Sequence, residues 1–111
     1  MSAPDFQDAL DRAAANSPFL ARLIEQRPAL VAHLRQGNPA AALAQAREEG
    51  EACDAVSNGL RVERGGVALA VAIADLAGAW DLSQVTRTLS DFADRACNRA
   101  IAAAITERTP D

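Results

Sequence analysis

Residues 60–80, LRVERGGVALAVAIADLAGAW, are the most hydrophobic stretch of the chain, and their second half carries only Asp75 as a charged side chain. A segment of this composition is expected to be buried. On an α-helix, which turns about 100° per residue, its bulky side chains fall in two stripes on nearly opposite sides. The first stripe is Val62, Leu69, Ile73 and Leu76, and the second is Leu60, Val67 and Val71. The pattern predicts one neighbouring element against each stripe.

Two further faces of this helix differ in side-chain size and charge. One carries Gly66, Ala70, Ala74 and Ala77, whose small side chains would let another backbone approach closely; the other carries Arg61, Arg64, Ala68, Ala72 and Asp75. The weak point is Gly65-Gly66, because an interior Gly costs about 1 kcal/mol relative to Ala. A break there would start the helix at Val67 and leave the two arginines on a loop. We favour one helix over about residues 60–78.

The chain before this segment carries repeated signals for helix starts. Pro4-Asp5 begins a short amphipathic helix, and Ser17-Pro18 and Asn38-Pro39 each pair an N-cap residue with a proline suited to the first helical position. Pro28 disfavours helical geometry in the residue before it and marks a kink or restart. Gly37 is a suitable stop.

Two helices are predicted after Gly37. The first runs from Pro39 to about Val56, where Gly50 bends or divides it, and Ser57-Asn58-Gly59 forms a turn into the central helix. After Gly78, Asp81 with Gln84 makes an Asp-x-x-Gln variant of the capping box. A long helix over about residues 82–106 follows. Its apolar positions recur at i, i+3 and i+4 and are expected to pack on the central helix: Val85, Leu89, Phe92, Ala93, Ala96, Cys97, Ala100, Ile101, Ala104 and Ile105.

No segment alternates apolar and polar residues in the manner of a strand. The sequence therefore predicts an all-α fold, a compact bundle of about five to six helices in which the central helix packs antiparallel to the long C-terminal helix. A chain of 111 residues fits one domain, residues 1–111. With 50% hydrophobic and 4% aromatic residues, its core must be built chiefly from Ala, Leu, Val and Ile.

Charge and composition exclude several classes of partner. The net charge of -4 opposes binding to the phosphate backbone of nucleic acid. The uncharged run over residues 65–74 is far shorter than the roughly 20 residues that a membrane span needs. The N-terminus lacks the basic and apolar regions of a secretory signal, so a cytoplasmic protein is expected. Cys53 and Cys97 lack metal-ligand spacing and are predicted to be packed thiols.

We predict no catalytic, cofactor-binding or metal-binding residue in this chain. Arg61, Arg64 and Asp75 are candidates for contact with another domain or a partner, because guanidinium groups bind anions and a carboxylate on an apolar helix seeks a cation. The simpler interpretation of all three is a solvated or structurally paired side chain. His33 and Ser90 lack partners for metal binding or nucleophilic catalysis, and Trp80 is expected to cover the core beside Gly78.

Several motifs, in their order along the chain, resemble a known family. SPFLARLIEQRPAL and NPAAALAQAR come first, then Leu60-Arg61 with Arg64, ADLAG over residues 74–78, and VTRTLSDFAD over residues 85–94. Together they resemble the N-terminal region of bifunctional glutamine synthetase adenylyltransferase/adenylyl-removing enzymes. The resemblance implies a parent enzyme that transfers AMP from ATP to a tyrosine of glutamine synthetase, removes it by phosphorolysis, requires Mg²⁺ and responds to PII signalling proteins.

The family's catalytic carboxylates follow a Gly-rich G-S-D-x-D motif, which this sequence lacks. The resemblance therefore implies an N-terminal helical fragment that supports a downstream nucleotidyltransferase domain and catalyses nothing alone, with no cofactor of its own. Its partners would be the remainder of the parent enzyme, glutamine synthetase and PII. Two alternatives stay open: a free-standing module that binds a partner helix through the Gly66, Ala70, Ala74 and Ala77 face, and an independent small-molecule-binding bundle.

Overall fold

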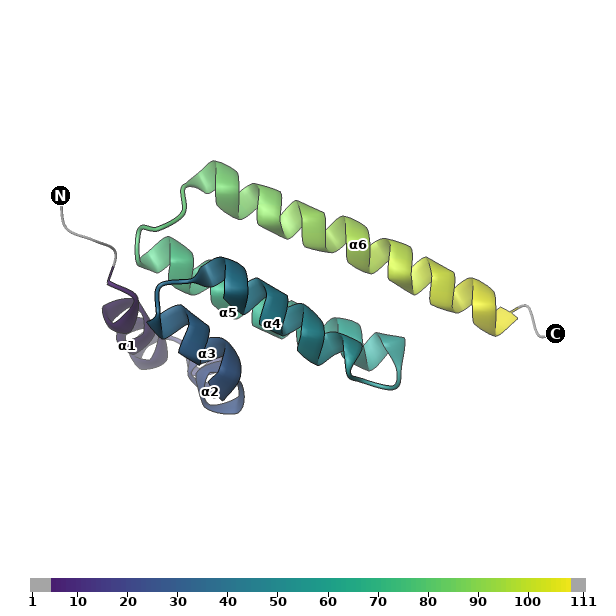
Figure 1. Cartoon of the computed structure of the whole chain (residues 1–111), viewed down its shortest axis with the longest axis horizontal. Coiled ribbons are helices and arrows are strands. Elements are labelled where there is room, and N and C mark those ends of the chain that lie inside the picture. Colours follow the sequence, from purple (N-terminus) through teal and green to yellow (C-terminus); the bar gives the residue numbers. More distant parts are fainter. Residues whose placement is uncertain (1–4, 109–111) are drawn as a thin grey trace.

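The computed structural model describes residues 5–108, with side chains as far as Thr106. Within that range the chain forms six α-helices and no strand, which confirms the predicted all-α bundle. The helices are α1 (Phe6–Asn16), α2 (Pro18–Gln26), α3 (Pro28–Arg35), α4 (Pro39–Glu51), α5 (Val56–Leu76) and α6 (Leu82–Arg108). Figure 1 shows α1–α4 gathered around α5, while α6 runs along α5 and packs on no other helix.

The helix starts follow the signals in the sequence, although Pro4 lies outside the described residues. Four side chains cap the following helix by accepting a backbone N–H: Asp5 from Asp8 at 2.9 Å, Ser17 from Leu20 at 3.2 Å, Asn38 from Ala41 at 3.0 Å, and Asp81 from Gln84 at 2.8 Å. Prolines occupy the first turn of α2, α3 and α4. These caps satisfy N–H groups that have no partner within the helix.

Two helices end on glycines that adopt the left-handed conformation. The φ angles of Gly37 and Gly78 are 75° and 76°, a region that other residues rarely enter. After α3, the N–H of Asn38 returns to the carbonyl of His33 at 3.0 Å, and after α5 the N–H of Ala79 returns to Ala74 at 2.9 Å. Both are Schellman motifs, which reverse the chain sharply. The second one turns α6 back along α5.

The central helix is continuous through Gly65-Gly66, as favoured above, but it begins one turn earlier than predicted. The predicted turn at residues 57–59 is wrong, because these residues form the first turn of α5. The helix before it ends at Glu51, not near Val56, and continues through Gly50 without a division. The reason is packing: a Cβ atom added to Gly59 would lie 2.4 Å from the carbonyl oxygen of Gly50. Gly59 permits a close backbone contact inside a helix.

The faces of α5 are occupied much as their side chains predict. Leu69 and Ile73 are fully buried and Val71 is nearly so. The face with Gly66, Ala70, Ala74 and Ala77 is here called the small-residue face. A Cβ atom added to Gly66 would lie 2.5 Å from the Cβ of Ala46, so the close neighbour of this face is α4 of the same chain. The predicted close approach of another backbone to this face is confirmed, but the neighbour belongs to the same chain. The alternative of a separate partner helix bound at Gly66 is therefore wrong.

The C-terminal helix packs antiparallel to α5 as predicted, but it buries far less than its apolar pattern suggested. None of its described side chains is fully buried, and only Val85 and Phe92 pack partly against the core. Leu89 and Ile101 are 45% and 52% exposed. Cys97 is exposed, which contradicts its predicted burial. A helix with a single neighbour can bury only one narrow stripe.

The bundle measures 59 × 28 × 21 Å. A helix of the length of α6 spans about 40 Å at 1.5 Å per residue, so α6 accounts for much of the long dimension. None of the helices in the described part of the chain is long and apolar enough to cross a membrane.

Candidate functional site

The three residues predicted as partner contacts all lie on α5 and are all exposed. Arg64 and Asp75 share one side of the helix, but about 16 Å of helix axis separates them at 1.5 Å per residue. Arg61 lies one turn before Arg64. The structure therefore leaves these side chains accessible and does not bring them together into one site, and their contact role stays a prediction.

The remaining candidate residues are scattered over different helices. His33 is half-buried in the last turn of α3, and Ser90 is exposed on α6. The thiol of half-buried Cys53 donates to the carbonyl of Glu49 at 3.6 Å. Trp80 follows α5 and packs against the core, as predicted. Among the described residues, no cluster of three or more His, Cys, Asp or Glu side chains could hold a metal ion.

The most unusual side chain is one that the sequence did not single out. Glu63 on α5 is completely buried, and two arginines of α6 reach it. The Nη1 atom of Arg95 lies 2.6 Å from Oε2 of Glu63, and the Nη1 atom of Arg99 lies 3.6 Å from Oε1. Arg95 also lies over the ring of Phe92, with its guanidinium carbon 5.7 Å from the ring centroid. This contact joins α5 to α6.

A buried carboxylate is costly unless cations or hydrogen bonds compensate for the water it has lost. Here the compensation is mainly charge, because both Glu63 oxygens and both Nη1 atoms lack a well-aligned hydrogen-bond partner. The side chains of Arg95 and Arg99 are 32% and 31% exposed, so both keep contact with water. Two cations against one anion leave the junction with one net positive charge.

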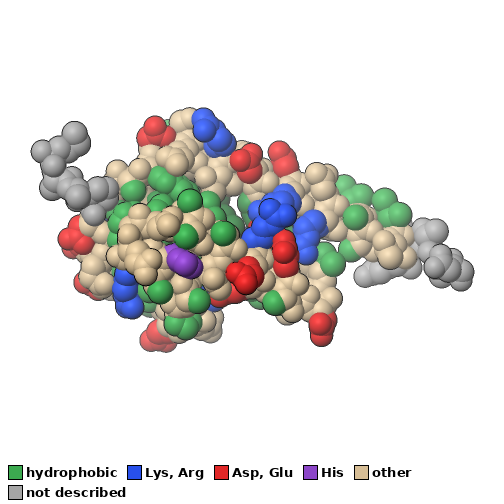
Figure 2. All heavy atoms as spheres, viewed as in Figure 1, with side chains coloured by type: hydrophobic (Ala, Val, Ile, Leu, Met, Phe, Trp, Pro, Cys, Tyr) green, Lys and Arg blue, Asp and Glu red, His purple; other side chains and the backbone are tan. Residues whose placement is uncertain are grey.

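A second ion pair on α4 adjoins this junction. Arg47 and Glu51 pair at 2.8 Å. The hydrogen bond from Arg47 lowers the pKa of Glu51, and the positive charges of Arg99 and Arg95 act in the same direction. The same hydrogen bond raises the pKa of Arg47, with a further contribution from Glu63. Figure 2 shows basic and acidic side chains gathered between α4 and α6.

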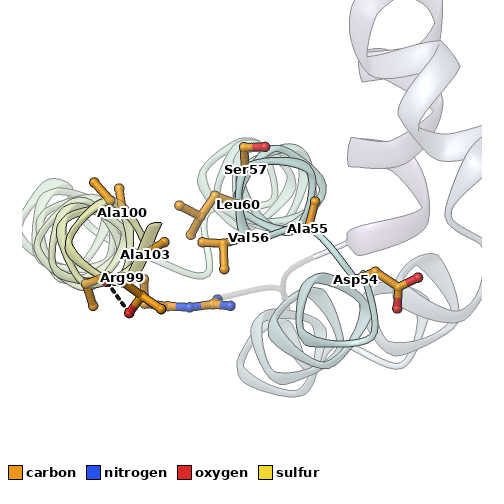
Figure 3. A pocket seen from close by; sticks show the side chains of 11 residues that line it. Asp54, Ala55, Val56, Ser57, Leu60, Arg99, Ala100 and Ala103 are labelled. Atoms are coloured by element: carbon orange, nitrogen blue, oxygen red, sulfur yellow. Dashed lines mark hydrogen bonds between the residues drawn. The ribbon is translucent and has the colours of Figure 1, made fainter. Parts of the chain in front are cut away.

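An open groove of about 910 Å³ lies beside this junction, between the first turns of α5 and the C-terminal half of α6. In Figure 3, Leu60 of α5 points toward α6, and Val56 lies beside it on the side where the Arg99 guanidinium extends. The guanidinium of Arg99 extends along one side, from α6 toward α5. We call this surface the α5–α6 groove. Its walls are mostly apolar, with Arg99 and Asp54 as the charged lining residues, and such walls suit binding of an apolar segment.

The burial of Glu63 has a signal in the sequence. Glu63 stands between Arg61 and Arg64, where it looks like one more surface charge. On the helix, however, it lies one turn from Gly59 and one turn from Gly66, within the small-residue face that packs on α4. A Cβ atom added to Gly50 would lie 3.0 Å from the Cβ of Glu63. A charge within a small-residue face predicts a buried ion pair.

The chain matches known proteins over nearly its whole length. The model of the family described as glutamate-ammonia ligase adenylyltransferase matches residues 7–111. A bifunctional glutamine synthetase adenylyltransferase/adenylyl-removing enzyme of Rhodopseudomonas palustris is 35% identical over 105 residues, which cover 88% of this chain and 11% of that protein. The enzyme of the same name in Xanthobacter autotrophicus is 37% identical over 95 residues, covering 80% of this chain and 10% of that protein.

The Caulobacter vibrioides protein of that name is 35% identical over 97 residues, which cover 82% of this chain and 10% of that protein. The chain thus spans about a tenth of the length of the curated relatives that it matches. No solved structure matches it.

Proposed function

Because the chain belongs to the glutamate-ammonia ligase adenylyltransferase family, we propose that it is the N-terminal helical part of an enzyme that adenylylates and deadenylylates glutamine synthetase. Its task in that enzyme is structural. It supports a downstream nucleotidyltransferase domain and does not itself catalyse adenylyl transfer.

One observation carries this proposal: the match extends over residues 7–111 here but covers only 10–11% of relatives with that enzymatic name. The chemistry of this chain agrees with a supporting role. Its most distinctive polar cluster joins α5 to α6 and consists of one buried carboxylate and two arginines. Such a cluster holds two helices together and offers no nucleophile.

The proposal extends to the surroundings of the parent enzyme. Adenylyl transfer requires ATP and Mg²⁺, which the downstream domain would bind. Glutamine synthetase is the parent enzyme's protein substrate and PII is its signalling partner. The parent enzyme would meet both in the cytoplasm. Arg61, Arg64 and Asp75 remain proposed contacts to another domain or partner, since all three are exposed on one helix.

The test compares the full-length enzyme with the same enzyme lacking residues 1–111. With glutamine synthetase, Mg²⁺ and labelled ATP, the full-length enzyme should label glutamine synthetase. The deletion should unfold at a lower temperature and lose most of the activity, while residues 1–111 alone should neither label the substrate nor bind Mg-ATP in calorimetry. Micromolar binding of Mg-ATP by residues 1–111, or full activity and stability of the deletion, would contradict the proposal.

A further inference from the structure

We propose that the α5–α6 groove is the surface on which the rest of the enzyme docks, and that an amphipathic helix with acidic side chains beside its apolar face fills it. This inference rests on the proposed function, and it specifies which surface of the helical part makes the contact and which chemistry the contact requires.

The C-terminal helix carries apolar side chains that nothing in the described chain covers. Its apolar positions continue around the helix from the groove toward Leu89, Ala93 and Ile101, and the two large ones are about half exposed. An apolar helix face of this width is normally packed against the rest of the protein. Only α5 packs on it here.

The groove has the dimensions of a helix-binding surface. Along α6 it extends from Arg99 to Thr106, about 10 Å at 1.5 Å per residue, or two helical turns. The side chains that face it from α6 include Ala100, Ala103 and Ala104. Helices pack about 8–10 Å apart, and the smallest separations need small side chains at the contact. Val56 and Leu60 supply the larger apolar side chains opposite (Figure 3).

The charges around the groove select an acidic occupant. Arg95 and Arg99 together exceed the charge of Glu63 by one, and exposed Arg64 follows Leu60 by one turn of α5. Asp54 lines one end of the groove, but its carboxylate points away from α6 in Figure 3. The three arginines named here outnumber the two carboxylates, Glu63 and Asp54, by one, although the chain as a whole has a net charge of -4. Carboxylates beside the docking helix would complement this excess of positive charge.

The relatives are long enough for the same polypeptide to supply the docking helix. The matched region is 10–11% of those proteins, so most of the polypeptide that could cover α6 lies outside it. A helix supplied by the same chain also binds at a high effective concentration. A second copy and a separate partner protein are the competing occupants.

The experiment measures thiol accessibility in the full-length enzyme. In a Cys53→Ser, Cys97→Ser background, with any other reactive cysteine also replaced, a single cysteine is introduced by Ala104→Cys in the groove. Ala15→Cys on α1 and Ala44→Cys on α4 serve as controls, because all three alanines are exposed in this structure. A docked helix should slow maleimide labelling of Ala104→Cys at least tenfold relative to both controls, equally at low and high protein concentration.

The charge requirement is tested in the same protein. Arg64→Glu should restore fast labelling of Ala104→Cys, whereas Arg22→Glu, at an exposed position of α2, should leave it slow. Labelling of Ala104→Cys as fast as the controls, in a preparation that adenylylates glutamine synthetase, would overturn the docking proposal. Protection that grows with protein concentration would assign the groove to a second copy and also overturn it. Slow labelling of Ala104→Cys in a protein that does not adenylylate glutamine synthetase would support the docking proposal and contradict the proposed function.

Discussion

The two long contacts of α5 are built in opposite ways. Against α4 it presents glycines and alanines, so that the backbones meet at Gly50–Gly59 and at Ala46–Gly66 with no space for an added Cβ atom. Against α6 it presents a buried carboxylate held by two arginines that are each about a third exposed, beside an open groove. The first contact is complete within this chain. The second leaves one side of α6 uncovered, the side that carries Leu89, Ala93 and Ile101. This is the side on which we infer that the rest of the enzyme packs.

Of the two contacts of α5, the α4–α5 contact should show the larger effect. Gly66→Ala would force its Cβ atom to within 2.5 Å of Ala46 and 2.9 Å of Leu30. Overpacking of this kind costs about 1–3 kcal/mol and occasionally more, so we expect a loss of about 3 kcal/mol in the free energy of unfolding. Urea denaturation followed by circular dichroism measures it.

The neighbouring glycine is the matched control. A Cβ atom at Gly65 would first meet a methyl group of Leu23 at 3.3 Å, the end of a flexible side chain. Ala is favoured over Gly in a helix by about 1 kcal/mol, so Gly65→Ala should be neutral or slightly stabilising. Equal losses from Gly65→Ala and Gly66→Ala would mean that close packing on α4 is not what makes the second glycine necessary.

A smaller loss is expected at the α5–α6 contact. Removing one partner of a fully buried ion pair costs about 3–5 kcal/mol. Because both arginines of this cluster stay about a third exposed, Glu63→Gln should cost less, about 2 kcal/mol. Arg95→Gln should cost more than Arg99→Gln, since the two Nη1 atoms lie 2.6 Å and 3.6 Å from the carboxylate.

A double-mutant cycle between Glu63→Gln and Arg95→Gln separates this pairing from general packing. The two losses should not add, because each variant removes the same interaction. Additive losses would show that Glu63 is stabilised by something other than the Arg95 charge.

The exposed apolar side chains on the uncovered side of α6, such as Leu89 and Ile101, should matter less for the stability of residues 1–111. Leu89 is 45% exposed, and substitutions at exposed positions usually change stability by about 0.5 kcal/mol or less. We expect Leu89→Ala to stay near that value, whereas Leu69→Ala, in the fully buried stripe, should cost about 2–5 kcal/mol. A loss above about 2 kcal/mol for Leu89→Ala would mean that this side of α6 is already packed.

The weakest effect is expected from the surface pair on α4. The hydrogen bond from Arg47 holds the pKa of Glu51 below its ordinary value of 4.5. A lowered carboxyl pKa stabilises the folded state above the unfolded-state pKa, and that contribution is lost as the pH falls through the lowered pKa. Glu51→Gln should therefore differ slightly from the parent chain at pH 7, and the difference should shrink as the pH falls below the unfolded-state pKa. A larger difference at pH 3 would have the wrong sign.

The sequence predicts most of the helices because their starts and ends are local events. Ser17, Asn38 and Asp81 accept hydrogen bonds three residues away, and Gly37 and Gly78 relieve a strain that arises within one turn. Such signals need no knowledge of the rest of the fold.

The errors concern contacts between helices. From the sequence alone, Gly59 is interpreted as a turn residue and Glu63 as a surface charge. Their roles become clear only from the contact of Gly59 with α4 and of Glu63 with Arg95 and Arg99 of α6. Cys97 was expected to be buried because the apolar pattern of α6 does not say how many neighbours that helix has. Periodicity predicts which face can be buried, but the partner must come from the tertiary structure.

Amide hydrogen exchange of residues 1–111 tests most directly whether the two contacts of α5 differ in this way. Amides in the middle of α5, over residues 66–73, should exchange only through global unfolding, while those of α6 over residues 99–104 should exchange at least 100-fold faster through local opening. In the full-length enzyme the α6 amides should slow toward the α5 values. Equal protection of both segments in residues 1–111 would contradict the account, because α6 would then need no neighbour beyond α5.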